Sequence, residues 1–104
     1  MTRPPVRVLY ASPYAASTPC VAGLVEWMRE CGWPVEFLRP SFRPGEPGEV
    51  PWPISRREFS ARARRFLLRP SRGAVAVDRT ALLLAAAFLP RGIPLVYFPT
   101  EVFL

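Results

Sequence analysis

The sequence predicts a protein of the α/β class, in which helices cover both faces of a parallel sheet of about four strands. Short β-rich runs alternate with helical segments along the whole chain. In the last third, an apolar segment at residues 80–89 lies between apolar runs at residues 74–78 and 94–99. Helices that are apolar all round are buried, and strands without polar alternation belong to sheets covered on both faces. We therefore expect a parallel sheet rather than a barrel, bundle or sandwich.

The first strand is expected at residues 6–11, where the chain reads VRVLYA. Thr18 and Pro19 then predict the start of a helix, as the N-cap residue and the first helical residue. Apolar residues on this helix recur at helical spacing, and Gly32 is placed for its left-handed cap; the residues are Val21, Leu24, Val25 and Met28. Residues 35–39 (VEFLR) are the expected second strand.

Residues 40–53 contain five prolines and two glycines, so no regular element is expected there. Ser55 and Glu58 have the spacing of a capping box, which predicts a second helix that ends near Arg69, before Pro70. One face of this helix is apolar: Phe59, Ala63, Phe66 and Leu67. Arginines occupy the remainder: Arg57, Arg62, Arg64, Arg65 and Arg69. The helix is therefore basic and amphipathic.

The remaining elements are a strand at residues 74–78, the apolar helix at residues 80–89, and a strand at residues 94–99. The resulting order, β-α-β-α-β-α-β, has right-handed crossovers in nearly all known proteins. It predicts a three-layer, Rossmann-like unit.

Length and composition limit the organisation and the chemistry. With 104 residues, 50% of them hydrophobic and 21% charged, the chain has the composition of one small globular domain. All fourteen basic residues are arginine, and the net charge of +6 favours acidic partners such as nucleic acid, anionic lipid or phosphorylated substrates.

Metal, cofactor and membrane-spanning functions find little support in the sequence. There is no histidine, and Cys20 and Cys31 lie about 16 Å apart along one expected helix, so no zinc site, disulfide between them or cofactor is expected. No apolar run approaches the roughly 20 residues needed to span a bilayer. We expect a cytoplasmic protein, with association at the inner face of the membrane as an open alternative.

The C-terminal third resembles the N-terminal domain of GT-B glycosyltransferases of the family 4 type. The matching features are Asp78 at a strand end, the apolar run at residues 81–89, Gly92-Ile93-Pro94, and an apolar strand followed by Glu101. The resemblance implies that residues 1–104 form a single partial domain, the first half of such an acceptor-side domain. It also implies sugar transfer from a nucleotide-sugar to an acceptor hydroxyl. The nucleotide-sugar would bind only if a second domain completed the chain, so the chain is expected to be inactive alone.

Two features depart from that family. The loop after the first strand, residues 12–17, lacks the usual glycines, and a histidine common near the end of the last strand has no counterpart among residues 98–101. Whether the chain is an enzyme is therefore left open.

Candidate substrate-binding residues lie after the first and third expected strands. Ser12, Tyr14 and Ser17 form a hydroxyl-rich loop before a helix, where an anion can bind. Capping of that helix by Thr18 is the alternative. Asp78 ends a strand, with capping of the next helix as its alternative. Glu101 is a weak candidate for acid/base catalysis, because ligands of open α/β sheets lie beyond the carboxyl ends of strands.

The arginine helix supports a different function. A basic amphipathic helix can contact an anionic lipid surface or a phosphate through Arg57, Arg62, Arg64, Arg65 and Arg69, although a solvated helix face is the alternative. The chain would then be a stand-alone, non-enzymatic binding module. Nucleic acid is not expected as a partner, because Phe59 and Phe66 lie on the packing face and offer no stacking platform. The apolar residues 102–104 are where an oligomer contact, a partner or a continuation of the chain is expected to attach.

Overall fold

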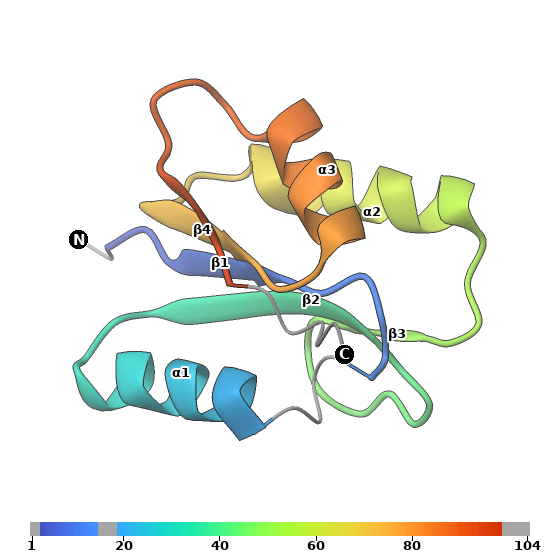
Figure 1. Ribbon diagram of the computed structural model, residues 1–104, viewed down its shortest axis with the longest axis horizontal. Coiled ribbons are helices and arrows are strands. Elements are labelled where there is room, and N and C mark those ends of the chain that lie inside the picture. The colour runs from blue at the N-terminus through green and yellow to red at the C-terminus, as the bar shows by residue number, and fades with distance from the viewer. Residues whose placement is uncertain (1–2, 15–18, 99–104) are drawn as a thin grey trace, which may run out of the picture.

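The computed structural model describes residues 3–14 and 19–98 and confirms the α/β class. Its sheet has five parallel strands in the order β3-β2-β1-β4-β5. The strands are β1 (Val6–Leu9), β2 (Val35–Ser41), β3 (Glu49–Pro51), β4 (Gly73–Ala76) and β5 (Leu95–Tyr97). The helices are α1 (Pro19–Glu30), α2 (Arg56–Leu68) and α3 (Arg79–Phe88). Helix α1 lies on one face of the sheet, and α2 and α3 lie on the other (Figure 1). This is the expected three-layer, Rossmann-like arrangement.

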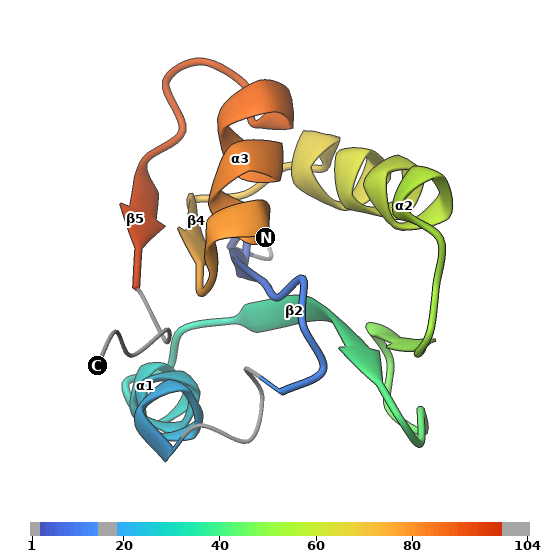
Figure 2. The ribbon, with the colours of Figure 1, turned by 45° about the vertical axis from the view of Figure 1, so that its right-hand side comes forward.

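Each face of the sheet has its own apolar core, because alternate residues of the central strand β1 point to opposite faces. Leu9 packs on the side of α2 and α3, with residues that include Phe59, Phe66 and Ala85. The residues on the side of α1 are Val6, Val8, Tyr10, Val25, Met28, Val75 and Val77. Figure 2 shows the helices of the two layers on either side of the strands.

The start of α2 confirms the predicted capping residue. The Ser55 side chain accepts a hydrogen bond from the Glu58 N–H at 3.1 Å, which satisfies a donor that the first helical turn leaves free. The buried residues of this helix are the predicted ones: Phe59, Ala63, Phe66 and Leu67.

The expectation that residues 40–53 contain no regular element was wrong. Strand β2 continues to Ser41, and β3 pairs with it from Arg39↔Glu49 to Ser41↔Pro51. Prolines are tolerated here because they fall where no ladder donor is required. The Arg39 N–H donates to the Gly48 carbonyl and the Trp52 N–H donates to the Ser41 carbonyl, so Pro51, between them on β3, faces away from β2.

The last helix and strand are less buried than expected. Ala81 and Ala85 are the buried residues of α3, whereas the Leu83 side chain is 69% exposed. Strand β5 lies at the edge of the sheet, and Val96 is 55% exposed. An apolar composition does not guarantee burial here. Among the described residues, β5 pairs with β4 alone, and α3 contacts the sheet with one face.

Candidate functional site

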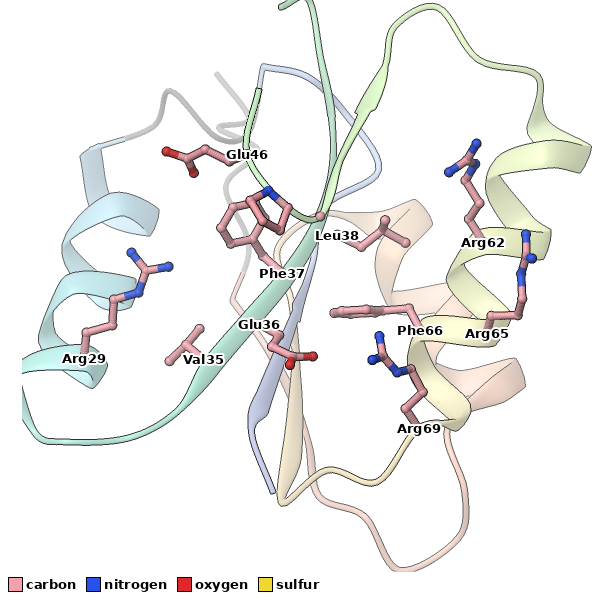
Figure 3. Close-up of a pocket in the computed structure, with 12 residues that line it drawn as sticks. Arg29, Val35, Glu36, Phe37, Leu38, Glu46, Arg62, Arg65, Phe66 and Arg69 are labelled. Atoms are coloured by element: carbon pink, nitrogen blue, oxygen red, sulfur yellow. The ribbon is translucent and has the colours of Figure 1, made fainter. Parts of the chain in front are cut away.

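A groove of about 650 Å³ lies beside the outer edge of β2. One wall comes from α2, with Arg62, Arg65 and Phe66, and from its C-cap residue Arg69. Arg29 of α1 lies on the opposite side (Figure 3). The edge of β2 between them contributes residues 35–38, and residues 46–48 of the loop before β3 close one end. Figure 3 shows Arg62, Arg65 and Arg69 on one side of β2 and Arg29 on the other. Cationic side chains therefore flank the strand edge on both faces of the sheet.

Helical spacing explains in part which arginines reach the groove. Residues three positions apart lie on one side of a helix, which places Arg62 and Arg65 together, and Arg69, the residue that caps the end of α2, lines the same groove. Of the five arginines predicted as an anionic-surface site, these three line the groove, and Arg57 and Arg64 do not. The groove therefore contains only part of the predicted basic surface.

The groove has unequal numbers of positive and negative charges. Glu36 forms an ion pair with Arg7 at 2.6 Å, and Glu46 lies 3.7 Å from Arg39, so both lining carboxylates have cationic partners outside the groove lining. Arg62 forms an exposed pair with Glu58 at 3.4 Å. Among the described residues, Arg29, Arg65 and Arg69 form no ion pair. The groove therefore carries cationic charge that the described chain leaves uncompensated.

Arg7, which was not predicted to be a site residue, is a buried cation beneath this groove. Its guanidinium donates to Glu36 Oε2 at 2.6 Å and to the Pro70 carbonyl at 3.0 Å, and it lies 5.1 Å from the centre of the Phe66 ring. Nε has no hydrogen-bond partner within the described chain. Arg7 thereby links β1, β2 and the end of α2. A charged residue inside the apolar VRVLY run was the available signal.

The β2–β3 loop is held by the carboxylate of Glu49. Its Oε1 accepts hydrogen bonds from the N–H groups of Gly45 and Glu46 at 3.0 and 2.8 Å, and its Oε2 accepts one from Arg39 Nε at 3.2 Å. The two backbone hydrogen bonds, with a smaller contribution from Arg39, lower the pKa of Glu49. The end of the groove at residues 46–48 therefore depends on an ionised side chain.

Asp78 lies at the carboxyl end of β4, next to the loop that follows β1. The strand order reverses between these two strands, which is where open α/β sheets commonly bind ligands. Asp78 is buried, its Oδ1 accepts the N–H of Ala81 at 2.8 Å, and its Oδ2 accepts the N–H groups of Ala11 and Ser12 at 2.8 and 3.2 Å. Its contact with Ala81 is the one expected if Asp78 caps helix α3, which was the predicted alternative to ligand binding.

The other candidate substrate-binding residues are partly described. Ser12 lies beside Asp78, and its hydroxyl accepts the N–H of Tyr14 at 3.2 Å. Tyr14 is exposed, with its ring edge-on to Phe42 at a centroid distance of 5.6 Å. The structure thus brings Ser12, Tyr14 and Asp78 together at the carboxyl ends of the strands. Ser17, Thr18 and Glu101 lie outside the described residues.

The pKa of Tyr10 is also shifted from its ordinary value. Burial raises the pKa of its phenol, and the Arg39 guanidinium, 5.9 Å from the ring centre, opposes that increase. Tyr10 packs in the core beside α1, which indicates a structural role for its ring.

Within residues 3–14 and 19–98, no three histidine, cysteine, aspartate or glutamate side chains are grouped so that they could hold a metal ion. No helix in the same residues has the length and apolarity to cross a membrane. Comparison with protein-family models, with curated proteins and with solved structures gives no match. Fold and site together define a small Rossmann-like α/β unit with a basic groove at the edge of its sheet.

Proposed function

We propose that this protein is a non-enzymatic binding module that holds an anionic partner in the groove beside the outer edge of β2. The observation that carries the proposal is the set of groove arginines without an ion-pair partner among the described residues: Arg29, Arg65 and Arg69. Like charges gathered in one groove produce a local positive potential that attracts anions.

The chemistry of arginine supports this function. A guanidinium group stays charged at all relevant pH values and donates two parallel hydrogen bonds to a phosphate or carboxylate. Phe66, Val35 and Phe37 supply apolar surface in the groove, which reduces competition by water for these hydrogen bonds. A phosphate or carboxylate group is therefore the chemistry that the groove fits best.

The glycosyltransferase function remains a prediction from resemblance. A parallel Rossmann-like sheet is compatible with it but is common to many functions. The Asp78 carboxylate, one of its candidate substrate ligands, already accepts three backbone hydrogen bonds. The uncompensated arginines therefore favour the binding module over sugar transfer.

The proposal is tested by calorimetric titration of the full chain with inorganic pyrophosphate, a hexaglutamate peptide, a nucleotide-sugar and vesicles containing phosphatidylglycerol. Pyrophosphate and the peptide are expected to bind, with affinity that falls as salt rises. The triple variant R62Q/R65Q/R69Q should bind them at least about tenfold more weakly, because each charge-assisted hydrogen bond contributes about 1.5 kcal/mol or more.

The matched control is R56Q/R57Q/R64Q, which removes the same charge from exposed positions of α2 outside the groove. It should change the affinity less than about threefold, since exposed charges act mainly through the screened, long-range field. Equal weakening by both variants would mean that net charge, and not the groove, attracts the anion. Binding of the nucleotide-sugar alone would favour the glycosyltransferase function instead.

A further inference from the structure

We propose that the partner in the groove is an extended acidic peptide that pairs as an additional strand with the outer edge of β2. This inference rests on the proposed function, and it adds the class of partner and its mode of binding. It is carried by the backbone of β2, which offers hydrogen-bonding groups in the middle of the arginine-lined groove.

The first half of β2 has an open edge. Residues 35–38 pair with β1 on one side, whereas β3 pairs only with Arg39 to Ser41 on the other. Within residues 3–14 and 19–98, no further strand pairs with residues 35–38. An unpaired strand edge is a template for another extended segment.

The hydrogen bonds of the neighbouring residues show which backbone groups face the groove. The carbonyls of Pro34 and Leu38 accept from the N–H groups of Val6 and Tyr10, so the even-numbered residues of this stretch face β1. The backbone hydrogen-bonding groups of successive residues in a strand point to opposite sides. The N–H and carbonyl of Val35 and the N–H of Phe37 therefore point away from β1.

The loop before β3 limits how far a new strand can extend. The Phe37 carbonyl oxygen faces Gly48, where an added Cβ would overlap that oxygen. A paired segment can therefore use about three backbone hydrogen bonds, which corresponds to roughly three to five residues of peptide. The bound peptide would lie on the same side of β2 as β3 and in line with it.

The arginines indicate acidic residues at alternate positions of the peptide. Side chains of paired strands that lie opposite each other share one face of the sheet. A residue opposite Glu36, and residues two positions from it, therefore face α2 with Arg62, Arg65 and Arg69. Residues between them face α1 with Arg29 and lie beside Val35 and Phe37. An alternating acidic and apolar segment matches both faces.

A second copy of this chain is a poorer occupant. Two β2 edges brought together would place the groove arginines of one copy against those of the other, and the chain already carries a net charge of +6. An acidic strand removes that repulsion, and so charge complementarity selects the peptide.

The experiment uses the full chain, labelled with ¹⁵N, and the blocked peptide acetyl-Glu-Val-Glu-Val-Glu-amide. At saturation, amide hydrogen exchange at Val35 and Phe37 should slow by at least about tenfold, as expected for donors that gain a ladder hydrogen bond. Exchange at Glu36 and Leu38, which face β1, should change much less. A peptide of the same composition in the order Glu-Glu-Glu-Val-Val should bind more weakly.

Two changes remove the strand pairing while leaving the charges. Two versions of the peptide, methylated at the backbone nitrogens of the valines or of the glutamates, cover both strand directions. The N–H groups of the two valines would donate to the edge in antiparallel pairing, and those of the glutamates in parallel pairing. One of the two methylated peptides should lose at least about tenfold in affinity. The variant V35P removes a donor that faces the groove and keeps the pairing with β1, so it should weaken peptide binding by a clearly larger factor than pyrophosphate binding. Should V35P fail to fold, the methylated peptides with the native chain decide the question.

The outcomes separate the two proposals. If neither pyrophosphate nor peptide binds, or if R62Q/R65Q/R69Q has no effect, the proposed function fails. If both bind through these arginines but neither methylated peptide binds more weakly and V35P weakens peptide and pyrophosphate binding equally, the function stands and strand pairing is overturned. Two further results would overturn the peptide as the partner. One is binding of anionic vesicles when the peptide does not bind, and the other is self-association of the chain in sedimentation experiments when the peptide does not bind.

Discussion

Glu49 shows how one carboxylate can organise a proline-rich connection. The N–H groups of Gly45 and Glu46 converge on its Oε1, and Arg39 contacts its Oε2. Residues 40–53 look structureless by composition because the propensities of proline and glycine are local. The side chain that orders the loop does so through contacts with the neighbouring strand.

The variant E49Q tests this role at the residue scale. The pKa of Glu49 is lowered in the folded state, so its ionised form stabilises the fold fully above the unfolded pKa of about 4.3 and less as the pH falls through the folded value. At pH near 7, E49Q should lower the free energy of unfolding by about 1 kcal/mol. Urea unfolding at several pH values measures this, and the difference from the native chain should shrink below about pH 4. A constant difference across this range would contradict the assignment.

At the level of single elements, the pairing of β3 with β2 requires the backbone at Gly48 to approach β2 so closely that a side chain at this position would not fit. Gly48 has a φ of 92°, and its Cα faces the Phe37 carbonyl of β2, next to the Arg39–Gly48 hydrogen bond that begins the pairing of the two strands. Gly32, after α1, has a φ of 80° but open space where a Cβ would be. The two glycines share a backbone conformation and differ in what surrounds them.

G48A and G32A are therefore a matched pair. G32A should destabilise the protein by about 1 kcal/mol, the usual cost of a left-handed conformation for a residue with a Cβ. G48A adds an overlap with backbone and should cost about 2 kcal/mol more, because the loop must shift. Chemical denaturation measures both, and amide exchange should show faster opening of β3 in G48A. Equal costs would mean that the contact with Phe37 relaxes freely.

At the scale of the whole molecule, burial and pairing are concentrated at the centre of the sheet. All four residues of β1 are buried and the strand pairs on both sides. In the part of the chain that the structure describes, β5 pairs with β4 alone, and two of its three residues are exposed. Native-state amide exchange should therefore be slowest in β1 and β4 and faster in β3 and β5, since local opening costs least where few contacts break. Uniform protection across the five strands would contradict this gradient.

Much of the fold was predictable because its signals are local or periodic. The cap at Ser55, the cap at Asp78, the end of α1 near Gly32 and the alternating order of strands and helices each depend on residues a few positions apart. The parallel sheet followed from the same order. Strand β3 was missed because its one proline, Pro51, is acceptable only in a particular pairing register. The exposure of α3 and β5 was missed because apolar composition does not report the number of neighbouring elements.

The candidate site was predictable only in part. The arginines of this segment were identified from the sequence, and helical spacing predicts that Arg62 and Arg65 share one side of α2. The place of Arg69 depends on how the chain leaves the helix, which only the structure shows. Arg29 and Glu46 lie far from these arginines in the chain and meet the same groove through the packing of α1 and the β2–β3 loop. The burial of Arg7 and its pairing with Glu36 likewise depend on β1 and β2 being neighbours.

By itself, the sequence determined the α/β class, the basic character of the chain and the amphipathic nature of α2, since each follows from composition or from spacing along one element. Only the tertiary structure decided that three arginines flank an open strand edge, that Asp78 accepts hydrogen bonds from the β1 loop, and that residues 40–53 contain a strand. The physical reason is that ion pairing, hydrogen-bond satisfaction and strand pairing depend on neighbours in space, which the parallel sheet assembles from segments distant in sequence.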